Sequence, residues 1–250
     1  MSGRIAWITG GGSGIGRALA LELANHGWRV AVTGRTRETL DEVAAAAPEG
    51  TVRAVPADVT DLAATREAVR KIESELGPID LAVLNAGVFK PFEAENFDAE
   101  AVNATMAVNY TGAVHGIDAV LPGMRERRSG HIALVSSVAG YRGLPLGAPY
   151  SASKAALIAL GESLKFDFDR LGIRTSVINP GFVKTPLTAK NKFPMPFLME
   201  VDDAARAMRK GLEKGRFEIA FPRPLVYGLK FMRLLPYALY FPLMRKATGR

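Results

Sequence analysis

The sequence predicts an α/β fold: a doubly wound parallel sheet of seven strands, with helices on both faces, in a single domain. Two observations lead to this prediction. Short continuous runs rich in valine, isoleucine and alanine alternate with helix-like segments along the chain. Such strands are typical of parallel sheets that are covered on both sides. Right-handed crossovers then wind the sheet in both directions.

The expected strands are the apolar runs at residues 4–9, 28–33, 51–57, 79–87, 131–137, 174–181 and 217–221. Helix-like segments lie at residues 15–27, 38–47 and 61–76, in a longer region that reaches about Leu121, and around residues 150–154. Pieces rich in glycine and proline, at 141–149 and 180–196, are predicted to be loops. Both follow strands on the carboxyl-end side, where sheets of this type bind ligands.

Composition narrows the class of protein. A chain of 250 residues fits one domain with a large core. Cysteine is absent, which excludes disulfides, thiol nucleophiles and cysteine metal sites. The chain has no uncharged apolar stretch of about 18 residues, and its N-terminus runs directly into the first strand. We therefore expect neither a membrane span nor a signal peptide, and we expect a cytoplasmic location.

The net charge of +7 is concentrated near the C-terminus. No acidic residue follows Glu218, whereas six basic residues do: Arg223, Lys230, Arg233, Arg245, Lys246 and Arg250. The basic character therefore belongs to a tail and does not predict a body that binds nucleic acid.

A glycine-rich turn, TGGGSGIG at residues 9–16, lies between the first strand and the first helix. Glycine allows the backbone to approach a pyrophosphate closely, and the following helix points its N-terminal amides at the anion. This context is typical of Rossmann-like sheets that bind dinucleotides, although such a turn can also serve packing alone. The residues expected at the cofactor are Gly10, Gly12, Ser13 and Ile15.

The end of the second strand bears on the type of nucleotide. An NAD site places a carboxylate there to accept hydrogen bonds from the ribose 2′-hydroxyl. This chain has Gly34 at that position, followed by Arg35, whose guanidinium suits a 2′-phosphate in charge and geometry. The alternative is an ordinary solvated arginine. Because the acid is also missing, NADP(H) is favoured over NAD(H).

Tyr150 and Lys154, in the stretch YSASK, are four residues apart and would share one face of a helix. A free tyrosine has a pKa of about 10, and a neighbouring cation favours the phenolate and lowers that pKa. A phenol tuned in this way can pass a proton to a carbonyl oxygen or take one from an alcohol. Taken alone, the spacing is common, and it fits a half-buried tyrosine and a solvated lysine at least as well.

Five motifs in order resemble those of the short-chain dehydrogenase/reductase family: TGGGSGIG, LNAG at 84–87, SS at 136–137, YSASK, and NPGFVKTP at 179–186. The resemblance covers roughly residues 4–190. It implies that Ser137 bonds the substrate oxygen and that Tyr150 is the acid/base, with Lys154 as its tuner and ribose anchor. It also implies that Asn109 holds a water in a proton relay, although Asn109 could instead be a packing residue. Ser137 lies thirteen residues before Tyr150, as the family spacing requires, and Ser136 is the less fitting serine because it lies one residue further away.

The resemblance implies further cofactor contacts. The expected set is Asp58 and Val59 at the adenine, Asn85, Ala86 and Gly87 at its ribose, and Pro180, Gly181, Val183 and Thr185 near the nicotinamide, together with Tyr150 and Lys154. Asp58 could instead cap the helix expected at residue 61.

Other chemistries lack their motifs. Neither the GxSxG nucleophile elbow nor the GxxxxGK[ST] phosphate loop is present. His26, His115 and His131 do not have the spacing of metal ligands, so no metal site is expected.

We divide the chain into a Rossmann-fold domain, residues 1–221, and a basic, apolar tail, residues 222–250. A substrate lid is expected at about 186–202. Its apolar residues are Phe193, Met195, Phe197, Leu198 and Met199. They favour an apolar substrate, although they could simply close over the core.

The tail interleaves leucine, phenylalanine, methionine and tyrosine with basic residues. Pro236 and Pro242 are expected to interrupt any long helix there. The tail is expected to pack on the domain or on a partner subunit, or to lie at a membrane surface.

Together these observations predict an oxidoreductase that interconverts a carbonyl and a secondary alcohol, prefers NADPH, acts on an apolar substrate and forms a homo-oligomer, a dimer or a tetramer. Two alternatives stay open. One is a catalytically silent NADP-binding sensor or scaffold on the same fold. The other is a peripheral membrane-associated reductase of a lipid-type ketone.

Overall fold

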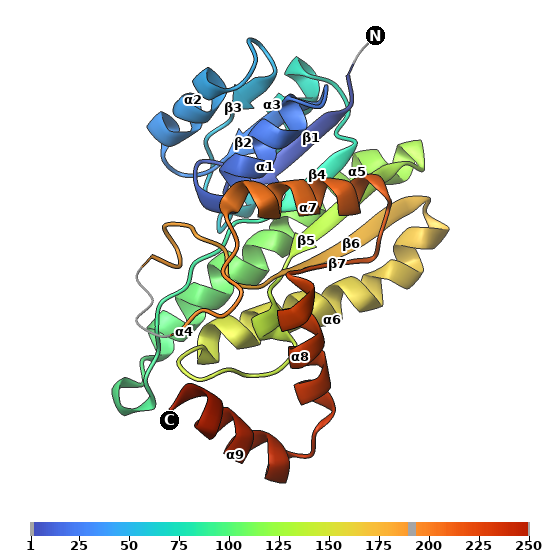
Figure 1. Ribbon diagram of the computed structural model, residues 1–250. Coiled ribbons are helices and arrows are strands. Elements are labelled where there is room, and N and C mark those ends of the chain that lie inside the picture. The colour runs from blue at the N-terminus through green and yellow to red at the C-terminus, as the bar shows by residue number, and fades with distance from the viewer. Residues whose placement is uncertain (1–2, 190–193, 250) are drawn as a thin grey trace.

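The computed structural model describes residues 3–189 and 194–249. Seven parallel strands form one sheet in the order β3-β2-β1-β4-β5-β6-β7 (Figure 1). They are Ile5–Thr9 (β1), Arg29–Thr33 (β2), Val52–Ala54 (β3), Leu81–Leu84 (β4), Gly130–Val135 (β5), Ile173–Pro180 (β6) and Glu218–Phe221 (β7). The predicted doubly wound sheet is confirmed, and its winding reverses between β1 and β4.

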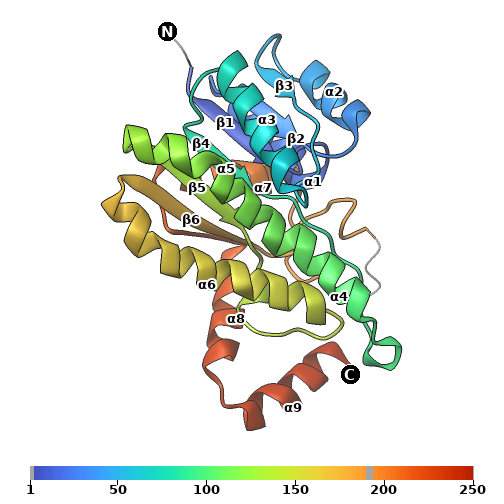
Figure 2. The same cartoon turned by 180° about the vertical axis from the view of Figure 1, so that it is seen from behind.

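Helices cover both faces of the sheet. One face carries α1 (Gly14–Ala24), α2 (Arg37–Ala46) and α7 (Val201–Glu213). The other carries α3 (Leu62–Glu75), α5 (Gly112–Arg127) and α6 (Ala148–Arg170), which stand in front in Figure 2. The remaining elements are α4 (Ala99–Met106), the short turns η1 (Ala94–Asn96), η2 (Ala107–Thr111) and η3 (Val138–Gly140), and the C-terminal helices α8 (Arg223–Leu234) and α9 (Tyr237–Thr248).

The central strands are mostly apolar because both of their faces are buried. In β1, Ala6 and Ile8 enter the core beneath α1, whereas Ile5 and Trp7 enter the core beneath α3 and α5. The one polar atom of Trp7 is satisfied, since its indole Nε1 donates to Thr33 Oγ1 at 2.9 Å. A parallel sheet of this kind leaves its functional groups to the loops at its carboxyl edge.

Two boundaries differ from the expectation. β3 ends at Ala54 rather than at residue 57, because Pro56 has no N–H to donate to the ladder and the strand lies at the sheet edge. The helical region expected to end near Leu121 instead runs to Arg127, with Pro122 inside α5. Pro122 has no N–H to donate to the carbonyl of Asp118. Because Pro122 is exposed, water can solvate that carbonyl instead.

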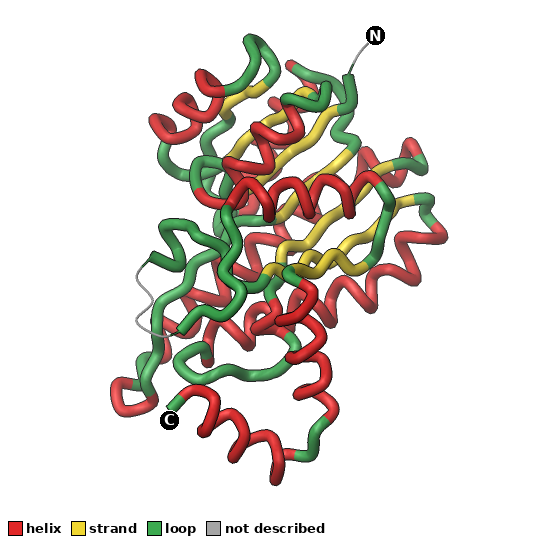
Figure 3. The backbone as a smooth tube through the Cα atoms, in the orientation of Figure 1, coloured by secondary structure: helices red, strands yellow, loops and turns green. Residues whose placement is uncertain are grey.

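The tail forms two helices, which Figure 3 draws as two red segments joined by a short loop. α8 packs on the body through Val226, which is buried in a small cluster with Val138, Tyr141 and Val177. The expected interruption occurs at Pro236, between α8 and α9, whereas Pro242 lies inside α9. Within residues 3–189 and 194–249, no helix combines the length and the apolarity that crossing a membrane requires.

His131 on β5 makes the stability of this fold depend on pH. Its side chain is buried, and its Nε2 lies 2.8 Å from Ser176 Oγ. That hydroxyl donates to the carbonyl of Arg216, so the ring nitrogen is the donor. Burial lowers the pKa of His131 to about 4.

We predict that the free energy of unfolding falls as the pH drops from about 7 to about 4, by roughly 3 kcal/mol from this group. The unfolded chain takes up the proton first, because its histidine titrates near 6.5. Urea unfolding at stepped pH measures the effect. His131→Gln, which keeps a donor but does not titrate, should flatten the slope; an unchanged slope would show that other groups cause it.

Candidate active site

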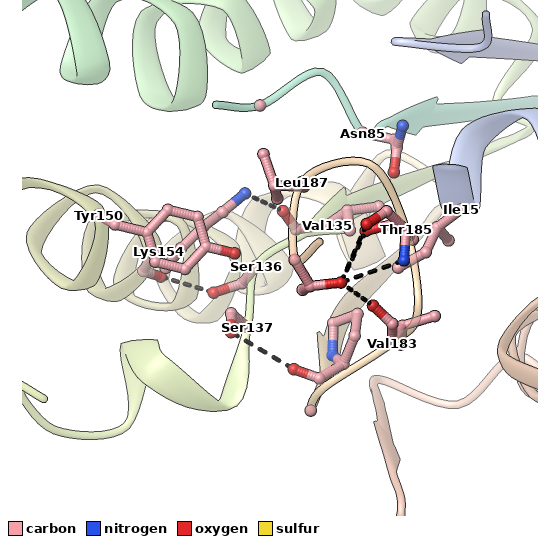
Figure 4. Close-up of a pocket in the computed structure, with 14 residues that line it drawn as sticks. Ile15, Asn85, Val135, Ser136, Ser137, Tyr150, Lys154, Val183, Thr185 and Leu187 are labelled. Carbon is pink, nitrogen blue, oxygen red and sulfur yellow. Dashed lines mark hydrogen bonds between the residues drawn. The ribbon is translucent and has the colours of Figure 1, made fainter. Parts of the chain in front are cut away.

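A pocket of about 100 Å³ opens at the carboxyl edge of the sheet (Figure 4). It is lined by the first turn of α1, the loop after β4, the end of β5, the start of α6 and the loop after β6. These are the segments that the sequence motifs occupy.

The glycine-rich turn is packed too tightly for side chains. Gly10 has φ +64°, and a Cβ there would lie 2.8 Å from the Cα of Ala86. A Cβ on Gly16 would lie 2.3 Å from the carbonyl oxygen of Gly10. Thr9 Oγ1 accepts the backbone N–H of Asn85 at 2.9 Å, and Asn85 Nδ2 donates to the carbonyl of Thr9 at 2.9 Å. The turn is therefore fixed to the end of β4.

The N-terminus of α1 fits a pyrophosphate. The helix begins at Gly14, the Ser13 side chain makes no capping bond, and the first turn holds no acidic residue. The partial positive charge of the helix end is thus not neutralised by a side chain of that turn. Together with the glycine cradle, this is the chemistry that a dinucleotide phosphate requires.

Ser137 and Tyr150 face the pocket from neighbouring elements. Ser137 caps η3, where its Oγ accepts the N–H of Ala139 at 3.1 Å and donates to the carbonyl of Pro180 at 3.3 Å. Tyr150 is half-buried in the first turn of α6, and the Phe89 ring packs edge-on against it at 5.2 Å. Burial raises the pKa of the Tyr150 phenol, and the Ser137 hydroxyl partly opposes this.

Lys154 lies one turn further along α6 and is buried rather than solvated. Its Nζ donates to the carbonyl of Val135 at 2.7 Å and lies 5.6 Å from the centroid of the Tyr150 ring. Burial lowers the pKa of Lys154 to about 8. The expected lowering of the tyrosine pKa is not found, because burial of the phenol is the larger effect.

Asn109 supports the site from behind the pocket wall. It is buried in the π-helical turn η2, where its Oδ1 accepts the N–H of Val88 at 2.7 Å. Its Nδ2 donates to the carbonyl of Val88 and to Ser153 Oγ, both at 3.0 Å. The side chain thus ties the loop after β4 to α6, and a proton relay through Asn109 stays a prediction.

Asp58 is not the helix cap. Asp61 caps α3, with its side chain accepting the N–H of Ala64 at 2.9 Å. Asp58 Oδ1 accepts the N–H and the hydroxyl of Thr60, and the N–H bond is the main cause of its lowered pKa. Its Oδ2 accepts no hydrogen bond from the described residues, which leaves a carboxylate oxygen for a ligand donor. Val59 is buried, with a methyl group beneath Gly112.

Arg35 is exposed and makes no ion pair with any residue of 3–189 or 194–249. Arg37 contrasts with it, since its guanidinium pairs with Asp41 at 3.4 Å. The charge of Arg35 contributes to the lowered pKa of Asp58. Arg35 and Asp58 therefore lie within electrostatic range of one another, at the ends of β2 and β3.

Ten residues predicted for the site line the pocket: Ile15, Asn85, Gly87, Ser137, Tyr150, Lys154, Pro180, Gly181, Val183 and Thr185. Eight predicted residues do not line it: Gly10, Gly12, Ser13, Arg35, Asp58, Val59, Ala86 and Asn109. Gly10, Gly12 and Ser13 belong to the glycine turn, and Ala86 lies next to it in the loop after β4. Arg35, Asp58 and Val59 lie after β2 and β3, and Asn109 lies behind the pocket wall.

Four lining residues were not among the individually predicted site residues: Val135, Ser136, and Leu187 and Thr188 of the expected lid. Ser136 donates to the carbonyl of Lys154 at 2.7 Å, so it secures α6. Thr188 donates to the carbonyl of Val183 at 2.6 Å and accepts the N–H of Thr185 at 3.0 Å. The sequence could have indicated Thr188, since it is a second threonine three residues after Thr185 in the same loop.

The lid residues take different positions. Met199 packs against the core, whereas Phe197 and Leu198 are exposed, and Leu187 reaches the pocket. Phe193 lies outside the described residues. In the described part of the chain, no cluster of three histidine, aspartate or glutamate side chains could hold a metal ion.

Comparison with known proteins assigns the family. The family described as short chain dehydrogenase matches residues 4–194. The chain belongs to this family.

Its relatives are oxidoreductases by name. An uncharacterized oxidoreductase of Myxococcus xanthus is 46% identical over 244 residues, which cover 96% of either chain. One of Staphylococcus saprophyticus is 34% identical over 84% of this chain and 92% of its own.

Two solved structures share the fold. A short-chain dehydrogenase of Streptomyces avermitilis superposes with a TM-score of 0.84 and 28% identity, over 94% of this chain and 93% of that one. An alcohol dehydrogenase of the archaeon Thermococcus sibiricus, complexed with 5-hydroxy-NADP, superposes with a TM-score of 0.78 and 25% identity, over 87% and 95%. The chain is therefore an NAD(P)-linked oxidoreductase of this family.

We predict that Gly16→Ala weakens binding of NADPH by about tenfold or more. The new methyl group would meet the backbone of Gly10, so the turn must shift away from its position at the helix N-terminus. Titration of NADPH fluorescence measures the affinity.

Gly228→Ala in α8 is the matched control, because no atom lies within 4 Å of the added Cβ. It should leave binding unchanged and stabilise the protein by roughly 0.5–1 kcal/mol. Equal NADPH affinity for both variants would contradict the assignment of the turn.

Proposed function

We propose that this dehydrogenase reduces an apolar ketone or aldehyde to the alcohol with NADPH, or catalyses the reverse reaction. The observation that carries the proposal is that Ser137, Tyr150 and Lys154 line one pocket together with Ile15 of the glycine-turn helix. A proton donor, a hydroxyl for the substrate oxygen and a cation thus converge beside the proposed nucleotide site.

When bound, the nicotinamide would supply or accept the hydride. Tyr150 would donate a proton to the carbonyl oxygen, and its raised pKa keeps the phenol in the acid form that reduction requires. Ser137 Oγ would donate a second hydrogen bond to the same oxygen and stabilise its developing charge. Lys154, with a pKa of about 8, is mostly protonated at pH 7 and would hold the ribose hydroxyls. Phe89 would keep the phenol ring in place.

The preference for NADPH rests on Arg35. Its guanidinium is exposed without an ion pair in the described structure, and Gly34 occupies the place of the acid that would accept a ribose 2′-hydroxyl. A free guanidinium is suited to bind a 2′-phosphate. The NADP-type ligand of the T. sibiricus relative supports this proposal.

An apolar substrate is supported by the side chains around the pocket. Leu187 and Val183 line it, Phe89 contacts Tyr150, and Phe197 and Leu198 of the lid are exposed. Apolar side chains rather than charged ones would therefore meet the part of the substrate beyond its carbonyl.

Assembly and location also stay proposals. We propose a homo-oligomer in the cytoplasm, in which residues 1–221 hold cofactor and substrate and residues 222–250 form a separate functional tail. The alternative of a catalytically silent NADP-binding scaffold predicts NADPH binding without turnover.

The proposed activity predicts NADPH oxidation with a series of aldehydes and ketones of increasing size and apolarity, followed at 340 nm. Tyr150→Phe should lower kcat by about 10²- to 10⁴-fold, because the proton donor is lost. Its affinity for NADPH should change little.

Tyr227→Phe is the matched control, since it removes the hydroxyl of an exposed tyrosine on α8 and should leave kcat unchanged. A kcat of Tyr150→Phe equal to that of the wild type would refute the proton-transfer role. NADPH binding by the wild type, with no substrate of the series reduced, would favour the silent scaffold.

Arg35→Glu should raise the Kd for NADPH by about 10- to 100-fold, because a charge-assisted contact to the 2′-phosphate is replaced by repulsion. The Kd for NADH should change far less. Arg37→Glu, at an arginine already paired with Asp41, serves as the control and should affect both nucleotides weakly. Equal losses for NADPH and NADH in Arg35→Glu would remove the basis for the preference.

A further inference from the structure

The tail helices expose an unusual amount of apolar surface. We call the following set the tail surface: Tyr227, Phe231 and Leu234 on α8, and Tyr237, Leu239, Phe241 and Leu243 on α9. Each of these side chains is between 47% and 81% exposed. Large apolar side chains exposed in this number are unusual for a surface that faces only water, and they indicate a contact with something outside the chain.

The helical spacing explains the part of the tail surface that lies on α8. Tyr227, Phe231 and Leu234 recur at the four- and three-residue intervals that form one stripe on α8. Val226 lies on a different face, which packs against the body. On α9 only Tyr240 is buried, so nearly all of this apolar helix is uncovered.

The charges of the tail surface have one sign. Arg223, Arg233, Arg245 and Lys246 are exposed, and none forms an ion pair with the described residues. Lys230 is paired with Glu218, the last acidic residue of the chain. An occupant of this surface must therefore supply both apolar contact and negative charge.

The two helices are held at a fixed angle by Arg142. Its Nη1 donates to the carbonyls of Met232 at 2.8 Å and of Leu235 at 2.7 Å, at the end of α8. Its guanidinium lies 4.6 Å and 3.9 Å from the ring centroids of Tyr237 and Tyr240 on α9. The tail surface is therefore presented as one unit and not as two loose helices.

We propose that the tail surface docks on an anionic lipid bilayer. Aromatic and leucine side chains would enter the boundary between headgroups and acyl chains, and the four unpaired cations would meet anionic headgroups. Helices of twelve residues, about 18 Å long, are suited to lie on a bilayer rather than cross it.

A second copy of the chain fits this surface less well. A symmetric dimer would place the same patch on both sides of the interface. Basic residues would then face basic residues, and the tail has no acidic residue after Glu218 to pair with them. Like charges brought together in this way oppose association.

Docking through the tail surface would bring the membrane close to the loop that leads into α6, next to the pocket. Tyr240 donates its hydroxyl to the carbonyl of Gly143 at 2.6 Å, and Arg142 precedes it in the loop that leads into α6. Figures 1 and 2 place α9 beside this loop, at the end of the molecule where the site lies. Docking in this position would allow an apolar substrate to pass from the lipid to the pocket. That role rests on the proposed function, whereas the docking itself does not.

The test is co-sedimentation of the full-length protein with vesicles of phosphatidylcholine, alone or mixed with phosphatidylserine. We expect binding to the mixed vesicles that weakens as salt is added. The double variant Arg245→Glu/Lys246→Glu should weaken it by at least about 30-fold, because each lost cation is worth about fivefold. Lys210→Glu/Lys214→Glu makes the same change of charge at the end of α7 and should bind as the wild type does.

A second pair of variants tests the apolar contact. Phe231→Ser should weaken binding by about tenfold, because a phenylalanine that would be buried in the bilayer is lost. Phe166→Ser removes an even more exposed phenylalanine from α6 and should have no effect.

Tyr150→Phe should bind vesicles as the wild type does, so a failure of the proposed reductase activity would not be mistaken for a failure of docking. Equal binding to both kinds of vesicle, or none, would overturn the proposal. So would an oligomer that dissociates on Phe231→Ser in analytical ultracentrifugation, since a second copy would then cover the surface.

Discussion

The site depends on a series of hydrogen bonds, partly or fully buried, that joins the first strand to α6. It begins at the point where the sheet reverses its winding, with the bonds exchanged between Thr9 and Asn85. It continues at Val88, whose N–H and carbonyl are both held by Asn109, and it ends where Asn109 reaches Ser153 on α6. A buried polar group that loses its partner costs about 1–3 kcal/mol, so each bond constrains the next. The glycine turn and α6 are thereby placed relative to one another.

Burial shifts the pKa values of Tyr150 and Lys154 in opposite directions, and both shifts favour the neutral form of the side chain. It raises the pKa of the phenol and lowers that of the ammonium to about 8, because the charged form of either group is poorly solvated there. A charged phenolate is therefore disfavoured in the protein by itself. Lys154 is also engaged with the carbonyl of Val135 rather than with the phenol. The arrangement keeps the phenol in its neutral form, which is the form that the proposed proton transfer to a carbonyl oxygen would use.

Those parts of the fold that rest on local pattern could be predicted from the sequence. The apolar runs gave the seven strands, and the motif spacing brought Ser137, Tyr150 and Lys154 to one pocket. The parts that depend on distant partners could not be predicted. The π-helical turn at Asn109 is fixed by a loop 21 residues away, and the path of α9 is fixed by Arg142, more than 90 residues before it. The burial of Lys154 likewise depends on packing between elements rather than on the YSASK spacing.

The tryptophans and half of the tyrosines lie in different parts of the molecule. Trp7 and Trp28, the only tryptophans of the sequence, are both buried: Trp7 lies within β1, and Trp28 comes directly before β2. Of the six tyrosines, Tyr227, Tyr237 and Tyr240 lie on the tail helices. Tryptophan emission will therefore report on the nucleotide half of the protein, whereas the tyrosine bands of near-ultraviolet circular dichroism will be weighted towards the tail. The two regions can thus be followed independently in a single sample, without a label or an added chromophore.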